Sequence, residues 1–221
     1  AGGRIGGVIF FIEYMQYVST RGGVEPTGLP QAILTGIAPD GGLFYPETIP
    51  QVTDAERRGF AELSYAELAA EVFCRFSPDF THADILALAQ EAYDPQRYTD
   101  PAIAPVRRLQ DDVFLLELFH GPTGAFKDFA LQLLPRVMRH AAGQLDAGET
   151  CILVATSGDT GGAALAGFAE VPGMHLVTFF PRGGVSPLQQ AQMQCARGSN
   201  LCVVEIEGDF DGAQKSVKEL F

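Results

Sequence analysis

The stretch CILVATSGDTGGAALA at residues 151–166 decides the fold class of this chain. It opens with an apolar run of strand length, residues 151–155. A polar, glycine-rich loop follows at residues 156–162, and the small residues after it favour a helix. A strand that enters a helix through such a loop is typical of the βα units of α/β proteins.

Strand-like and helix-like segments alternate on both sides of this stretch. Three further apolar runs have the length of strands, at residues 113–119, 175–180 and 201–206. Helical patterns lie between and after the strands, at residues 127–142, 161–169, 188–197 and 210–221. This alternation predicts an α/β fold with right-handed βαβ units around a mostly parallel sheet.

Two local features refine this prediction. Asp111 and Asp112 separate residues 106–109 from residues 113–119, which predicts a hairpin turn. Pro135 lies inside the first predicted helix, where its missing N–H should kink or divide the helix.

Residues 15–100 have mostly helical patterns after a short extended segment at residues 17–20. A capping box at residues 64–67 and a looser version at residues 81–84 predict two helix starts, and the Asp94-Pro95 step ends the second helix. The turn sequence PDGG occupies residues 39–42. The apolar faces expected for the two helices are Leu68, Val72, Phe73 and Phe76, then Ile85, Leu88, Ala89 and Ala92.

We expect three segments along the chain. Residues 1–14 lack the turn chemistry and the clear period of a domain start and stand directly before Met15, so we interpret them as a leader that is not native to the domain. A short extra strand is the alternative. Residues 15–100 are then an N-terminal domain, and residues 101–221 the first part of an α/β region.

The composition excludes several classes of protein. The 221 residues carry a net charge of −12, which disfavours non-specific nucleic-acid binding. No apolar run reaches the roughly 18–20 residues of a membrane span, and the apolar run near the start is too short for a signal peptide. The four cysteines and four histidines have no metal-site spacing. We expect buried, reduced thiols in a cytoplasmic protein.

The first loop that could carry chemistry is HGPTGAFK, residues 120–127. It follows a predicted strand and places Lys127 in the first turn of a predicted helix. The helix dipole disfavours an ammonium group there and favours the free amine that a Schiff-base lysine requires. A solvated lysine without a chemical role is the alternative. His120 could contact a ligand or make a structural hydrogen bond.

The second such loop is TSGDTGG, residues 156–162. Backbone N–H groups and hydroxyls converge at the start of its helix, which suits a carboxylate or a phosphate. Asp159 would repel an anion, so we expect it to cap the helix or to bond a neutral or cationic group. The loop matches neither nucleotide-binding glycine pattern. Ser157 has no His–Asp arrangement nearby, and an ordinary capped βα turn is the alternative.

In order along the chain, these motifs resemble the threonine synthase family of fold-type-II pyridoxal-phosphate enzymes, whose fold is like that of the tryptophan synthase β subunit. The most specific segment is ELFHGPTGAFKDF, residues 117–129, which is similar to the cofactor-lysine motif of the family. The resemblance extends from about Met15 to the last residue. The other matching segments are YVSTRG (17–22), LTGIAPDGGLFYPE (34–47), ATSGDTG (155–161), PRGGVSPLQ (181–189) and GDFD (208–211).

The resemblance implies the roles of individual residues. Lys127 would hold pyridoxal 5′-phosphate and move protons on the substrate, O-phospho-L-homoserine, which is converted with water to L-threonine and phosphate. Phe126 and Asp159 would lie beside the cofactor, with Asp159 near the ring hydroxyl. Packing considerations alone instead place Phe126 and Phe129 in the core. The residues implied to hold the substrate carboxylate are Thr156, Ser157, Gly158, Asp159 and Thr160.

The sequence departs from the family pattern in two ways. Gly184 and the Gln190-Ala191 pair stand where the family usually has basic residues, and Arg182 remains. This leaves open a related phospho-lyase or dehydratase with a different substrate. The chain also stops inside a predicted helix, before the glycine-rich loop that binds the cofactor phosphate in the family. We therefore expect about half of an enzyme, and an inactive truncated fragment is the third alternative.

Overall fold

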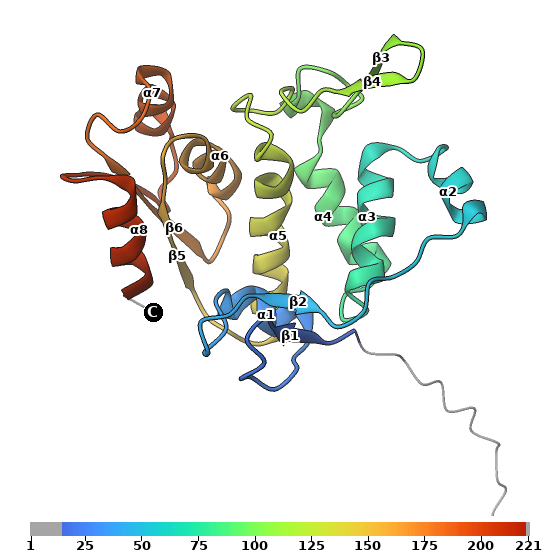
Figure 1. Ribbon diagram of the computed structural model, residues 1–221, viewed down its shortest axis with the longest axis horizontal. Helices are drawn as coiled ribbons and strands as arrows, with labels where there is room; N and C mark the ends of the chain where they lie inside the picture. The colour runs from blue at the N-terminus through green and yellow to red at the C-terminus, as the bar shows by residue number, and fades with distance from the viewer. Residues whose placement is uncertain (1–14, 220–221) are drawn as a thin grey trace, which may run out of the picture.

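The computed structural model of the protein describes residues 15–219, so the predicted leader at residues 1–14 lies outside the described residues. A helical region and an α/β region lie on opposite sides of the long helix α5, Asp128–Gln144 (Figure 1). A hairpin projects from one end of the molecule, and a small two-stranded sheet lies at the other end.

The α/β region is built on a three-stranded parallel sheet. Its strands are β5 (Thr150–Ala155), β6 (Met174–Pro181) and β7 (Leu201–Ile206), in the order β5-β6-β7. The pairing is in register from Thr150 opposite Met174 through Ala155 opposite Phe179. Three of the four predicted strands, and the parallel arrangement, are therefore confirmed.

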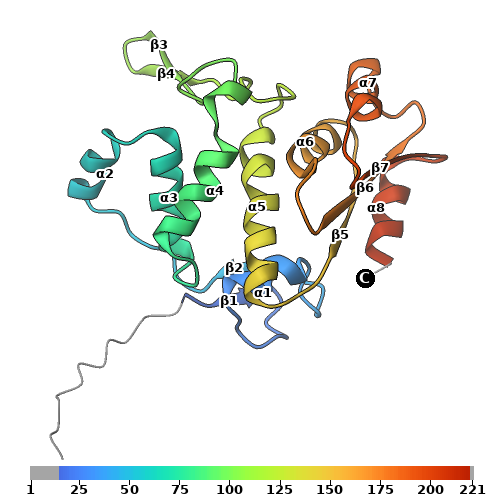
Figure 2. The same ribbon diagram turned by 180° about the vertical axis from the view of Figure 1, so that it is seen from behind.

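Helices cover both faces of this sheet, as is usual for a parallel sheet. Helix α6 (Asp159–Phe168) packs on one face, and α8 (Phe210–Glu219) on the other (Figure 2). Helix α7 (Pro187–Cys195) lies against α6. The core between sheet and helices contains Leu165, Phe168, Leu176, Phe180 and Met193, all at most 1% exposed.

Helix α5 runs without interruption through Pro135, so the prediction that this proline could divide the helix is wrong. Pro135 has no N–H to donate to the carbonyl of Leu131, four residues earlier. The backbone of Gly167 on α6 lies against that carbonyl, since a Cβ built on Gly167 would be 1.9 Å from the Leu131 oxygen. The Leu131 carbonyl, which Pro135 leaves without its helical N–H partner, is thus the point where the backbone of α6 packs against α5.

The helical region contains α1 (Leu29–Thr35), α2 (Asp54–Phe60), α3 (Tyr65–Phe76), α4 (His82–Ala92) and a short 3₁₀ turn at Pro95–Arg97. The predicted starts of α3 and α4, and the end of α4 before Pro95, are confirmed. The predicted face of α4 is buried throughout. On α3 the prediction for Val72 is wrong, because this side chain is 42% exposed and Ala70 is the fully buried residue.

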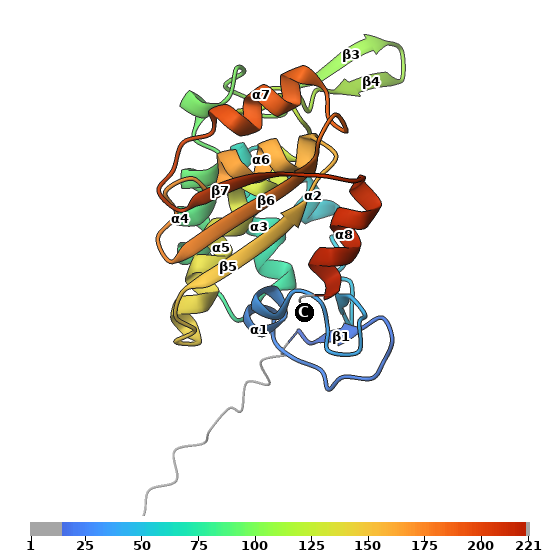
Figure 3. The same ribbon diagram turned by 90° about the vertical axis from the view of Figure 1, so that its left-hand side faces the viewer.

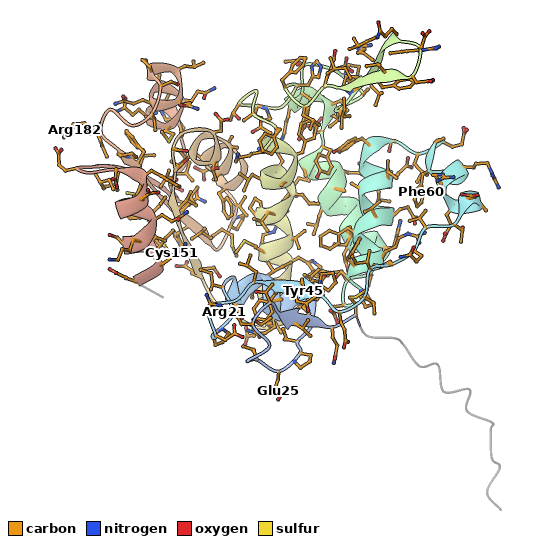
Figure 4. The ribbon with its side chains drawn as sticks, in the orientation of Figure 1. Arg21, Glu25, Tyr45, Phe60, Cys151 and Arg182 are labelled. Carbon is orange, nitrogen blue, oxygen red and sulfur yellow. The ribbon has the colours of Figure 1, made fainter. Side chains whose placement is uncertain are left out.

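Asp40 connects the sequence motif at residues 17–22 to the motif at residues 34–47, to which it belongs. Strand β1 (Tyr17–Ser19) pairs with β2 (Phe44–Pro46). The Asp40 carboxylate accepts hydrogen bonds from the Ser19 hydroxyl at 2.7 Å and the Gly23 N–H at 2.8 Å, and Arg21 donates to the Asp40 carbonyl at 2.9 Å. Figure 4 shows Tyr45 in β2, and Arg21 in the turn after β1, at the foot of the view. Hydrogen bonding, chiefly from Ser19, lowers the pKa of Asp40.

Strands β3 (Val106–Gln110) and β4 (Val113–Leu116) form the predicted antiparallel hairpin around Asp111-Asp112. The expectation that residues 113–119 form one of the alternating strands of the parallel sheet is wrong. The hairpin is a separate two-stranded sheet, and every residue of both strands is exposed. An apolar run of this length is compatible with either placement.

The thiols are free but less buried than the sequence predicts. Cys74 is partly buried, and Cys151, Cys195 and Cys202 are exposed. Cys151 and Cys202 belong to β5 and β7, which are the two edge strands of the parallel sheet. Within residues 15–219, no helix has both the length and the apolar character needed to cross a membrane.

A pH prediction follows from Glu56 in the capping box of α2. Its carboxylate accepts from the Thr53 hydroxyl and N–H at 2.7 Å and from Arg75 at 2.9 Å, and these bonds lower its pKa from 4.5 to about 2. A carboxyl whose pKa is lower in the folded state stabilises the fold above pH 4.5 and loses this effect as the pH falls toward 2. We expect Glu56→Gln to melt below wild type at pH 6, with the gap closing between pH 4.5 and 2.

The control for this measurement is Glu62→Gln. Glu62 is exposed, and its side chain makes no hydrogen bond or ion pair within residues 15–219. Thermal melts of this variant should follow wild type at every pH. A gap for Glu56→Gln that stays constant from pH 6 to pH 2.5 would contradict the assignment.

Candidate active site

Lys127 is the N-cap residue of α5, one position before the helix begins. The sequence placed it in the first turn, so its location is close to the prediction. Its side chain is partly buried, and Nζ lies 4.3 Å from the centre of the Phe126 ring. Lys127 forms no ion pair within the part of the chain that the structure describes. This amine therefore has an aromatic neighbour and no carboxylate competing for it there.

Asp128 fixes the shape of the loop before Lys127. Its fully buried carboxylate accepts from the Thr123 N–H and hydroxyl, each at 2.8 Å. A Cβ built on Gly121 would lie 2.5 Å from Asp128, so the loop passes too close for a side chain there. Burial raises the pKa of Asp128, while the bonds from Thr123 lower it in part. The sequence reasoning assigned Asp128 no role, although its position beside Lys127 and the glycine at 121 were the available signals.

The second loop wraps around the hydroxyl of Thr156. This side chain is 1% exposed, and Oγ1 accepts from the N–H groups of Gly158 at 3.0 Å and Gly161 at 2.9 Å. The next N–H groups, of Asp159 and Thr160, have no hydrogen-bond acceptor within residues 15–219. Unpaired amides at a helix start attract a negative group. The loop thus presents two N–H groups without an acceptor at a helix start, and its role as an anion site stays a prediction.

Asp159 bonds a neutral amide, which is one of the two outcomes expected for it. Its Oδ1 accepts from Gln189 Nε2 at 2.6 Å, and its side chain does not cap α6. The N-cap position belongs to Gly158, whose φ is +140°. Gln189 lies on α7, and no part of the sequence pattern pointed to this contact.

The two loops lie close together. The Nε2 of Gln192 on α7 donates to the carbonyl of Thr123 at 3.1 Å. The charge of Asp159 in the second loop contributes to the raised pKa of Asp128 in the first. A pocket of about 230 Å³ lies between the first loop, α6 and α7, and its lining includes Pro122, Thr123, Gly162, Gln192 and Cys195.

The surroundings of three more side chains can be compared with the sequence predictions. Phe129 packs against Tyr65 and Tyr98, as predicted. The expectation that Phe126 packs in the core is wrong, because it is 60% exposed beside Lys127. His120 makes a structural bridge, from the Thr99 hydroxyl at 2.7 Å to Glu117 at 2.9 Å.

The segment that departs from the family pattern carries a paired arginine. Arg182 follows β6 and forms ion pairs with Glu205 and Glu207 (Figure 4). Gly184 lies in a turn where a Cβ would be 2.5 Å from the Pro181 ring. Gln190 donates to Glu205 at 3.3 Å. No group of histidine, cysteine or acidic residues within residues 15–219 is arranged to hold a metal ion.

Comparison with known proteins agrees with this arrangement. The family model described as "Threonine synthase N terminus" matches residues 16–93, and the one described as "Pyridoxal-phosphate dependent enzyme" matches residues 100–221. The threonine synthase of Pseudomonas aeruginosa is 40% identical over 209 residues, which are 94% of this chain and 44% of that protein. The threonine synthase of Corynebacterium glutamicum is 39% identical over 92% of this chain and 43% of its own length.

A crystal structure of pyridoxal-phosphate-bound threonine synthase from Brucella melitensis matches with a TM-score of 0.85 and 42% identity, over 94% of this chain and 44% of that one. The chain therefore spans somewhat less than half the length of these relatives. The second family model alone covers more than half of this chain. The fold, the order of the motifs and these matches together show that the chain belongs to the threonine synthase family of pyridoxal-phosphate-dependent enzymes.

Proposed function

We propose that the protein converts O-phospho-L-homoserine and water to L-threonine and phosphate, with pyridoxal 5′-phosphate bound at Lys127. Two observations within residues 15–219 carry this proposal: the Lys127 amine at the start of α5 forms no ion pair, and two amides at the start of α6 have no acceptor. An amine and an anion-binding loop are the two elements that a cofactor aldehyde and an amino-acid carboxylate require.

The residues present fit this cofactor. Lys127 offers a partly buried primary amine, and the exposed ring of Phe126 offers an apolar face beside it. When bound, the pyridine ring of the cofactor supplies an electron sink for proton movements at the substrate. Lys127 Nζ is the base that moves protons between Cα and Cβ in this proposal. Asp159, exposed in the second loop, is the partner proposed for the ring hydroxyl.

The loop at residues 156–160 would hold the substrate carboxylate. Within residues 15–219 the N–H groups of Asp159 and Thr160 have no acceptor and can donate, and the exposed Ser157 hydroxyl can add a third hydrogen bond. Thr156 acts differently, because its buried hydroxyl already organises the loop. Gly158 allows the backbone conformation with φ of +140° that this shape needs.

The second candidate function is a related phospho-lyase or dehydratase with a different substrate. It is favoured by the segment after β6, where Gly184 and Gln190 carry no charge and Arg182 is already paired with two carboxylates. A phosphate group approaching that segment would have to compete with Glu205 and Glu207. We place the boundary between the helical domain and the cofactor region near residue 100, and the reaction in the cytoplasm.

The experiment that tests the proposal has two parts. The protein is incubated with pyridoxal phosphate, reduced with borohydride, digested and mapped by mass spectrometry; an adduct on Lys127 is expected. Phosphate and threonine released from O-phospho-L-homoserine are then measured separately. Phosphate without threonine would support the second candidate, and no adduct on Lys127 would reject both enzymatic functions for this chain.

A further inference from the structure

Helix α7 places two glutamines against the two loops of the site. Gln189 Nε2 donates to Asp159 Oδ1 in the second loop at 2.6 Å. Gln192 Nε2 donates to the Thr123 carbonyl in the first loop at 3.1 Å. Residues three apart lie on the same side of a helix, so one face of α7 contacts both loops. Figure 3 shows α7 lying across the end of the sheet, above α6.

The amide of Gln189 is held in one orientation. Its Oε1 accepts from the Ser186 N–H at 3.0 Å as part of the capping box of α7, which leaves Nε2 facing Asp159. The side chain also covers Gly158, where a Cβ would lie 2.3 Å from the Gln189 amide carbon. The second loop is therefore shaped to pass under this one side chain.

The choice of glutamine is informative because the part of the chain that the structure describes has two other capping boxes. Those at α2 and α3 use Glu56 and Glu67, which only need to accept hydrogen bonds. A glutamate at position 189 would satisfy the Ser186 N–H equally well. It could not donate to Asp159, and it would place a second negative charge beside that carboxylate. The need for a donor explains the glutamine.

Gln192 acts on the lysine loop through Thr123. The carbonyl of Thr123 accepts from Gln192, and its N–H and hydroxyl both donate to Asp128, the residue after Lys127. A short series of hydrogen bonds thus connects α7 to the start of α5. The same helix connects to the start of α6 through Gln189.

We propose that α7 is a coupling element of the site and that Gln189 and Gln192 are positioning residues, which fix the substrate loop relative to the lysine loop. This inference rests on the proposed function of the two loops. Neither glutamine takes part in the chemistry. Their effect is to make the geometry of each loop depend on the other, so that disturbing one contact loosens both loops.

The test uses Gln189→Glu, which keeps the acceptor for Ser186 and removes the donor to Asp159, and Gln192→Leu, which removes the contact with Thr123. The matched control is Gln194→Glu, at an exposed position of α7 whose side chain contacts neither loop. We expect each of the first two variants to slow borohydride-trapped attachment of pyridoxal phosphate to Lys127 about tenfold. The control should stay within twofold of wild type.

Hydrogen exchange provides a readout that does not depend on the cofactor. Gln189→Glu is expected to speed exchange of the Thr123 and Gly124 amides, in the loop that it does not touch, as well as of Gly158 and Gly161. Gln192→Leu should speed exchange of the Gly158 and Gly161 amides, in the loop that Gln192 does not contact, as well as of Thr123 and Gly124. Faster exchange confined to the contacted loop would overturn the coupling. If wild type forms no adduct on Lys127, the proposed function fails, and exchange alone still decides whether α7 couples the loops.

Discussion

Replacing Lys127 by alanine is expected to lower the reduction-stable attachment of pyridoxal phosphate at least a hundredfold. The sequence contains three lysines, and the other two, Lys215 and Lys218, lie on α8. Lys215 is 78% exposed and pairs with Glu219 at 3.8 Å. Of the three, Lys127 lies beside an aromatic ring, 4.3 Å from the centre of Phe126, and forms no ion pair within residues 15–219. The loss follows because the attachment needs a positioned primary amine.

Because the sequence has three lysines, an adduct can be assigned to one of them and each can be substituted in turn. Lys127→Arg keeps the positive charge but cannot form the covalent bond, so it should behave like the alanine variant. Lys215→Ala should retain the full adduct on Lys127. Melting temperatures of all variants are compared to confirm that each is folded. An adduct of undiminished yield on α8 in Lys127→Ala would contradict the assignment of the cofactor lysine.

Gly167→Ala is expected to have the largest effect on stability. The added methyl would lie 1.9 Å from the Leu131 carbonyl oxygen and 2.8 Å from its carbon, both of which are backbone atoms of α5. Backbone cannot rotate away as a side chain can, so α5 and α6 must separate. We expect a loss of about 3 kcal/mol, the upper end for inserting a methyl into a packed core. For a chain of this size, that lowers the melting temperature by about 6–12 °C.

Gly143→Ala is the matched control for this prediction. Gly143 lies near the end of α5 and is exposed, and a Cβ added there would have no atom within 4 Å. Alanine there should stabilise the protein by up to about 1 kcal/mol, through its higher helix propensity. Chemical denaturation of the two variants gives the comparison. A Gly167→Ala variant within about 1 kcal/mol of wild type would show that the helices are less closely packed than described.

The parts of the fold that the sequence predicted are those governed by local signals. The capping box at Ser64, the helix start at Thr81 and the apolar runs at 151–155, 175–180 and 201–206 each depend on a short segment, and all are found. The placement of residues 113–119 in the parallel sheet was wrong because an apolar run indicates that a strand forms but not which sheet it joins. The predicted burial of Val72 was wrong for a similar reason, since helical spacing does not show how wide the buried face of a helix is.

The site residues that could be predicted are those that lie in continuous stretches of sequence. Lys127 and residues 156–160 lie in compact motifs, whereas the contacts that hold them in place come from α7, up to 69 residues away. In the sequence, Gln189 was the last residue of the matched segment 181–189, and Gln192 belonged to the predicted helix at residues 188–197, with no role assigned to either. Asp128 was missed for a different reason, because sequence alone does not reveal that a carboxylate beside a lysine is fully buried.

The exposed hairpin has a consequence for handling the protein in solution. Leu109 is 63% exposed and Phe114 is 60% exposed, and both outer edges of this two-stranded ribbon present unpaired backbone groups. Such edges are templates for pairing with other chains. The net charge of −12 keeps molecules apart, but salt screens that repulsion. Self-association through β3–β4 should therefore rise with both protein concentration and ionic strength, and dilute, low-salt buffer is the condition in which single chains are best measured.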